Sequence, residues 1–200
     1  MRLHFVQSLI SLSEARDDTF LVVGDLGFGV VEKFADRFPS RFLNAGVAEQ
    51  NMLGMAAGIA STEKLVFVYS IANFPSLRAL EQIRNDIAYH DLPVVVVSVG
   101  AGLGYGTLGY SHHAVEDISV LRSIPGMTVY SPADEIEVQA CMHDIALHRR
   151  PSYLRLGKGG EPSLHLDPLL NSVTPIRLSG SSSSNVVLSH GAIGHQVAQA

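Results

Sequence analysis

The sequence has little cysteine, no tryptophan and few charged residues. Its 200 residues include one cysteine, Cys141, which excludes an internal disulfide framework and favours a reducing compartment such as the cytoplasm. Fourteen Lys and Arg against 19 Asp and Glu give a net charge of −5, so we expect no nucleic-acid partner. No apolar run reaches the roughly 18 residues that a membrane span needs, and the N-terminus is predicted to be an amphipathic helix rather than a signal peptide.

Hydrophobic residues make up 46% of the chain, and they gather in short valine-rich runs that alternate with helical patterns. These runs predict strands at 20–24, 65–69, 93–99, 127–130 and 152–156. Helical periodicity predicts helices at about 2–16, 29–37, 47–61, 76–90, 115–124 and 134–148. Strands that are apolar on both faces, each followed by a helix, predict an α/β fold with a doubly wound, mainly parallel sheet and helices on both faces.

The composition changes near residue 157, where a glycine-rich loop begins. We expect residues 1–175 to form the main domain. Residues 176–200 are predicted to contain a linker, with the polar stretch SGSSSSN at 179–185, followed by the start of a further unit. That unit is predicted to open with a sixth strand at VVLSHG and to continue as a helix.

Ligands in open parallel sheets bind beyond the carboxyl ends of the strands, which draws attention to four loops. They are residues 24–29, 44–50, 70–75 and 100–113. The last contains Gly104-x-Gly106-x-x-Gly109, a spacing that also occurs in dinucleotide-binding loops. A nucleotide-binding or regulatory module that uses this loop is therefore one hypothesis, and a plain glycine loop is the other.

Glu49 and His112 are the candidate residues for acid–base chemistry. Glu49 lies in the first turn of a predicted helix, where a carboxylate either complements the helix dipole or, among these small and apolar neighbours, serves a ligand as a buried proton donor. His112 and His113 are adjacent in a loop, so their side chains should point apart, and we predict no metal site. One of them is predicted either to bind a ligand or to cap backbone groups.

Four segments taken together resemble the pyrimidine-binding domain of transketolase-type enzymes, which use thiamine diphosphate. The segments are FLNAGVAEQNMLGMAAGIA (42–60), ALEQIRNDIAYHDLPVVVV (79–97), GLGYGTLGYSHHAVEDISVLRSIPGMTVYSPAD (102–134) and PSYLRLGKG (151–159). The resemblance covers about residues 1–175, and it implies the α/β fold of that family. Residues from Asn185 onward resemble the start of the family's third domain.

The resemblance implies roles for five residues. Glu49 corresponds to the glutamate that hydrogen-bonds the cofactor's aminopyrimidine nitrogen and favours the imino tautomer, which then takes the thiazolium proton. His112 lies where the family has a substrate-binding histidine, and Phe74 is nearest to the ring that stacks on the pyrimidine, although it is shifted by about one position. Lys158 stands where the family usually has a phosphate-binding arginine, with Arg155 close by in sequence.

Two departures from the family pattern shape the functional prediction. The glycine loop has Gly106-Thr107-Leu108-Gly109 where the family carries an acidic pair, so the sugar or sugar phosphate substrate stays open. Gly24-Asp25-Leu26 is not the family's diphosphate–magnesium motif. We therefore expect one chain of a split transketolase-like transferase, inactive without a partner chain that binds the diphosphate and Mg²⁺, and forming at least a homodimer. The enzyme alternatives are the β subunit of a thiamine-dependent 2-oxoacid dehydrogenase or a deoxyxylulose-phosphate-synthase-like enzyme.

Overall fold

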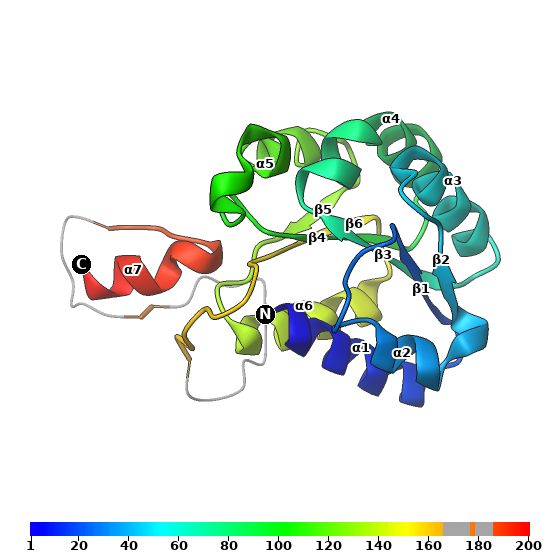
Figure 1. The fold of residues 1–200 in the computed structure, drawn as a ribbon, viewed down its shortest axis with the longest axis horizontal. Helices are drawn as coiled ribbons and strands as arrows, with labels where there is room; N and C mark the ends of the chain where they lie inside the picture. The colour runs from blue at the N-terminus through cyan, green and yellow to red at the C-terminus, as the bar shows by residue number, and fades with distance from the viewer. Residues whose placement is uncertain (166–176, 179–185) are drawn as a thin grey trace.

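A six-stranded parallel sheet forms the centre of the computed structural model, which describes residues 1–165, 177–178 and 186–200 (Figure 1). The strand order is β2-β1-β3-β4-β6-β5, and every pair of neighbours is parallel. The strands are β1 (Thr19–Val23), β2 (Phe42–Asn44), β3 (Leu65–Ile71), β4 (Val94–Val99), β5 (Thr128–Tyr130) and β6 (Ser152–Leu156). The predicted parallel α/β sheet is confirmed.

Helices cover both faces of the sheet, as the alternating pattern predicts. One face packs against α1 (Arg2–Ala15), α2 (Glu32–Arg37) and α6 (Glu135–His148), which lie together below the sheet in Figure 1. The other face packs against α3 (Glu49–Ala60), α4 (Leu80–Gln82) and α5 (Asp117–Leu121). The central strand β4 reads VVVVSV and all six of its residues are buried, which is why it carries no polar alternation.

The start of α6 follows the expected capping chemistry. The Asp134 carboxylate caps α6 by accepting a hydrogen bond from the backbone N–H of Glu137 at 2.9 Å.

No helix among the described residues is long and apolar enough to cross a bilayer.

Three parts of the chain differ from the sequence prediction. The strand β2 was missed because three residues, Phe42–Asn44, are too few for a periodic signal. The helix predicted over 76–90 is instead two π-helical segments, η2 (Phe74–Arg78) and η3 (Ile83–Ala88), on either side of α4. The strand predicted from Val186 is wrong: residues 186–190 pair with no strand of the described chain, and the helix α7 (Gly194–Gln199) follows a 3₁₀ turn.

The predicted linker at 179–185 and the predicted domain boundary at 175 lie outside the described residues.

Candidate active site

The loops that carry the predicted site residues meet at the carboxyl edge of the sheet. From β1 the chain passes to β2 on one side and then to β3 on the other, so the edge beyond β1 and β3 is the topological switch point. Crevices at such points are where open α/β sheets bind ligands. Glu49 begins α3 after the β2 loop, Phe74 begins η2 after β3, and His112 lies in the long loop after β4.

Glu49 is a buried carboxylate at the first turn of α3. It is 1% exposed, and its Oε2 accepts a hydrogen bond from Nη1 of Arg78 at 2.6 Å. Its other oxygen, Oε1, is buried and has no hydrogen-bond partner in the described part of the chain. A buried carboxylate oxygen without a donor is costly, so Oε1 is an acceptor site suited to a ligand N–H.

The π-helical segment η2 brings Arg78 and Phe74 together beside Glu49. The guanidinium carbon of Arg78 lies 4.7 Å from the centroid of the Phe74 ring, within the range of a cation–π contact. π-helical turns are rare, and they occur often at functional sites because they redirect side chains that a regular helix would place elsewhere. The turn after β3 therefore places both a cation and an aromatic ring near Glu49.

His112 lies against the Phe74 ring. The two ring centroids are 5.2 Å apart with an interplanar angle of 62°, an edge-to-face arrangement. Nδ1 of His112 is 2.9 Å from Oγ of Ser111, and the Ser111 carbonyl accepts a hydrogen bond from Nδ2 of Asn73 at 2.6 Å. The structure thus brings Glu49, Phe74 and His112 to one edge of the sheet, with Asn73 tying the two loops together.

His113 points to a different partner from His112. Its Nε2 is 2.9 Å from the Gly106 carbonyl oxygen, so it closes the glycine loop on itself. The prediction that the adjacent histidines diverge is confirmed. Among residues 1–165, 177–178 and 186–200, no group of three or more His, Cys, Asp or Glu side chains could hold a metal ion.

Lys158 approaches the site through Tyr105. The Lys158 ammonium lies 5.1 Å from the centroid of the Tyr105 ring, and that ring is 5.9 Å from the His112 ring. Burial raises the pKa of the Tyr105 hydroxyl above its ordinary value. Tyr105 can pack here because position 100 is glycine: a Cβ on Gly100 would lie 2.0 Å from the ring, and the backbone φ is +94°.

Arg155 is held by residues of the chain itself. Its Nε donates to Oδ2 of Asp117 at 2.7 Å, and its Nη2 donates to the Ala114 carbonyl at 2.8 Å. Asp117 is 1% exposed and also accepts a hydrogen bond of 2.6 Å from the hydroxyl of Tyr153. Burial and, after it, the Asp117 charge raise the Tyr153 pKa well above its ordinary value. The ion pair anchors the end of the His112 loop to β6.

We expect the Asp117→Ala variant to lose about 3–5 kcal/mol of unfolding free energy, because it leaves the charge of the largely buried Arg155 unpaired and deprives Arg155 Nε and the Tyr153 hydroxyl of their acceptor. Urea unfolding measures this loss. The neighbouring Glu116 is exposed, so Glu116→Ala is the matched control and should stay within about 0.5 kcal/mol. An equal, small change in both variants would contradict the anchoring role.

The glycine loop does not have the context of a dinucleotide site. Gly104–Gly109 leads into two 3₁₀ turns, η4 (Gly106–Leu108) and η5 (Tyr110–His112), and the short helix α5 begins only at Asp117. A pyrophosphate site needs a helix N-terminus directly at the glycines.

The thiol of Cys141 is a poor nucleophile, because burial raises its pKa to about 12.

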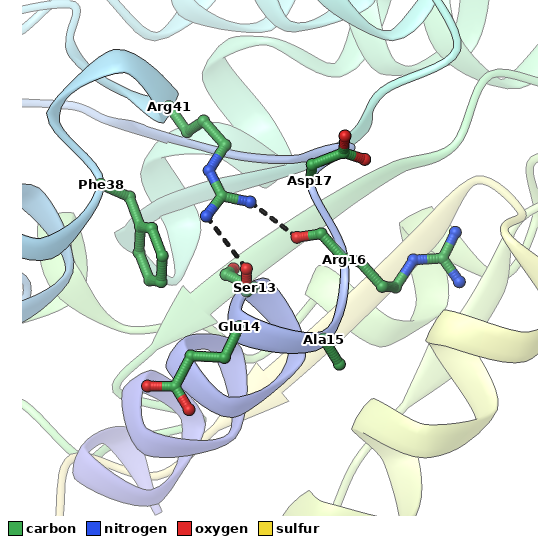
Figure 2. A pocket seen from close by; sticks show the side chains of 7 residues that line it. All are labelled: Ser13, Glu14, Ala15, Arg16, Asp17, Phe38 and Arg41. Atoms are coloured by element: carbon green, nitrogen blue, oxygen red, sulfur yellow. Dashed lines mark hydrogen bonds between the residues drawn. The ribbon is translucent and has the colours of Figure 1, made fainter.

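Two hollows on the described surface lie at the opposite, amino edge of the sheet. The first, shown in Figure 2, is lined by residues that precede β1 and β2, and one of them, Arg41, donates hydrogen bonds to the Ser13 and Arg16 carbonyls. The second is lined by residues that flank the starts of β3, β4 and β6, among them Leu92 and Arg149. Neither hollow contains a predicted site residue.

Four residues that shape the site were not predicted from the sequence: Asn73, Arg78, Tyr105 and Asp117. A partner for Glu49 could have been expected from the sequence, since a buried glutamate needs a cation or a hydrogen-bond donor. The sequence could not say which arginine supplies it, because 29 residues separate the two partners.

Comparisons with known proteins found a matching family and similar sequences and structures. The family model described as "Transketolase, pyrimidine binding domain" matches residues 1–161. A transketolase C-terminal section from Methanocaldococcus jannaschii is 43% identical over 157 residues, which are 78% of this chain and 50% of that protein. One chain of an apulose-4-phosphate transketolase from Phocaeicola vulgatus is 34% identical over 165 residues, covering 82% of this chain and 53% of that protein.

A solved structure is similar as well. It is a split gene transketolase, described as an inactive beta4 tetramer, with a TM-score of 0.74 and 34% identity over 84% of this chain and 54% of its own. The chain thus spans about half the length of the relatives it matches.

Proposed function

Because the chain belongs to the family of transketolase pyrimidine-binding domains, we propose that it is the pyrimidine-binding part of a split transketolase-like enzyme. The enzyme would transfer a two-carbon ketol unit between sugars or sugar phosphates. When bound, thiamine diphosphate supplies the nucleophilic carbon and the electron sink for this transfer. The residues of this chain would bind the pyrimidine half, orient it and exchange a proton with it.

The observation that carries the proposal is the buried Oε1 of Glu49, which has no hydrogen-bond partner among the described residues. A ring nitrogen that shares a proton with this oxygen would satisfy it, and Phe74, next to Arg78 and His112, offers an aromatic surface for stacking. The acceptor oxygen of Glu49 and the aromatic ring of Phe74 therefore fit an aminopyrimidine. In this proposal Glu49 acts as the acid–base group, because low local dielectric strengthens its hydrogen bond to the ring.

The substrate roles are proposed for the histidine and the basic residues. His112 would hydrogen-bond a substrate oxygen, since it lies beside Phe74 at the rim of the same edge. Lys158 is exposed and would attract a phosphate as a point charge, without the bidentate fork of arginine. Arg155 would contribute charge from behind the loop, as its Nε and Nη2 are engaged by Asp117 and Ala114.

The proposal includes a partner chain that binds the diphosphate and Mg²⁺, because this sequence lacks the diphosphate–magnesium motif. Large apolar side chains are exposed on the loops of the carboxyl edge, where such a chain would dock. They are Phe28, Val47, Leu103, Leu108, Tyr110 and Val115. A second copy of this chain would complete at least a dimer, and residues from Asn185 onward would begin a further transketolase domain. We place the enzyme in the cytoplasm.

A thermal-shift titration tests the proposal with this chain mixed with the diphosphate-binding chain and Mg²⁺. We expect thiamine diphosphate at about 100 times its dissociation constant to stabilise the complex by about 2.7 kcal/mol, seen as a rise in the unfolding midpoint. NAD is the matched control and should leave the midpoint unchanged. Stabilisation by NAD and not by thiamine diphosphate would favour a nucleotide-binding module built on Gly104–Gly109.

A further inference from the structure

The two oxygens of the Glu49 carboxylate have different surroundings. Oε2 accepts the short, charge-assisted hydrogen bond from Arg78, and Oε1 is buried without a partner in the described part of the chain. A carboxylate that is 1% exposed has little freedom once one oxygen is bound to a guanidinium. The pair therefore determines which oxygen is left for a ligand.

Arg78 is placed to hold this arrangement from outside. The Arg78 side chain is 49% exposed, so one side of it faces solvent while its guanidinium pairs with the buried Glu49. Its guanidinium carbon also lies 4.7 Å from the centroid of the Phe74 ring. One side chain thus contacts the two groups that are proposed to bind the pyrimidine, and the π-helical turn η2 sets its position relative to both.

We propose that Arg78 is a positioning residue for the thiamine-dependent reaction, an inference that rests on the proposed function. It fixes the Glu49 carboxyl group so that Oε1 is the oxygen that meets the ring nitrogen. The planar guanidinium does this with fixed geometry, which an ammonium group does not provide.

The opposing explanation is that Arg78 competes with the cofactor. A guanidinium is flat and donates hydrogen bonds, so it could occupy the place of the pyrimidine between Glu49 and Phe74. The two explanations predict opposite effects when Arg78 is removed. Positioning predicts slower activation of the cofactor, and competition predicts tighter binding of the cofactor with unimpaired activation.

The experiment uses the assembled enzyme, with the diphosphate-binding chain, Mg²⁺ and thiamine diphosphate. The readouts are the cofactor's dissociation constant and the rate at which its thiazolium C2 proton exchanges for deuterium, which reports activation without any sugar substrate. Arg78→Met keeps the length of the side chain and removes its charge and donors. Arg78→Lys restores the charge alone. Arg84→Met removes an exposed arginine of the neighbouring segment η3 and is the matched control.

We expect Arg78→Met to slow C2 exchange about 10- to 100-fold, the effect of losing one charge-assisted hydrogen bond, without tighter cofactor binding. Arg78→Lys should recover part of the rate, and Arg84→Met should match the wild type. Exchange at the wild-type rate in Arg78→Met, with or without tighter binding, would overturn the inference. Glu49→Gln distinguishes a failure of the Arg78 inference from a failure of the proposed function. If C2 exchange in Glu49→Gln also proceeds at the wild-type rate, the proposed function itself fails.

Discussion

Glu49→Gln in the assembled enzyme should reduce turnover by about 100- to 10,000-fold, the usual range for losing a general acid–base group. Glutamine keeps the size of the side chain and can still accept a hydrogen bond from Arg78, but it cannot exchange a proton with the pyrimidine. Steady-state ketol transfer at saturating thiamine diphosphate measures the effect, and extra cofactor should not restore the rate.

The fold of this variant should remain intact, because the buried contact with Arg78 loses charge but not volume. Glu81→Gln is the matched control: Glu81 is exposed on the neighbouring helix α4, and its variant should turn over like the wild type. Near wild-type turnover of Glu49→Gln with the partner chain present would contradict the acid–base role. Glu49 would then be a residue that complements the dipole of α3.

Sequence patterns predicted most of the fold because strands that are buried on both faces of the sheet appear in the sequence as unbroken apolar runs. The valine runs of β3 and β4 could be read directly, and Asp134 marked the start of α6 through its capping side chain. The signal failed where it was short or ambiguous. The three residues Phe42–Asn44 join the sheet at its edge only because β1 offers unpaired backbone groups, which no local pattern reveals.

The π-helical segments were beyond prediction for a different reason. Residues 76–90 carry helical periodicity, and periodicity cannot distinguish a π-helical turn from an α-helical one. In the structure Phe74–Arg78 widens into a π-helix, with Pro75 near its start, and this shape aims Arg78 at Glu49. The local sequence pattern and the backbone conformation therefore differ at this segment, which contributes residues to the proposed site.

The site itself was only partly predictable. The loop positions of Glu49, Phe74 and His112 followed from strand ends, since parallel strands bring those ends to one edge. The partners of these residues depend on contacts between distant segments, such as Asn73 with Ser111 and Arg155 with Asp117. Arg155 illustrates the limit, because the sequence placed its charge near the site and gave no indication of the buried acid that binds it.

This chain alone should show no ketol-transfer turnover, and activity should appear only when the diphosphate-binding chain and Mg²⁺ are added. The physical reason is that the proposed site supplies acid–base and stacking groups for one half of the cofactor, whereas much of the binding free energy of a charged cofactor comes from contacts to its diphosphate and metal. Titrating the partner chain into a fixed amount of this chain, with turnover as the readout, measures the dependence.

Two surface substitutions test where the partner chain docks. Phe28→Asp puts a charge on a loop of the carboxyl edge at a side chain that is 78% exposed, and it should raise the partner concentration needed for half-maximal activity because burying an unpaired charge opposes docking. Tyr89→Asp is the matched control, since Tyr89 is 83% exposed but precedes β4 at the amino edge. Full turnover by the purified single chain, or equal weakening by both substitutions, would contradict a partner that docks on the carboxyl edge and completes the site there.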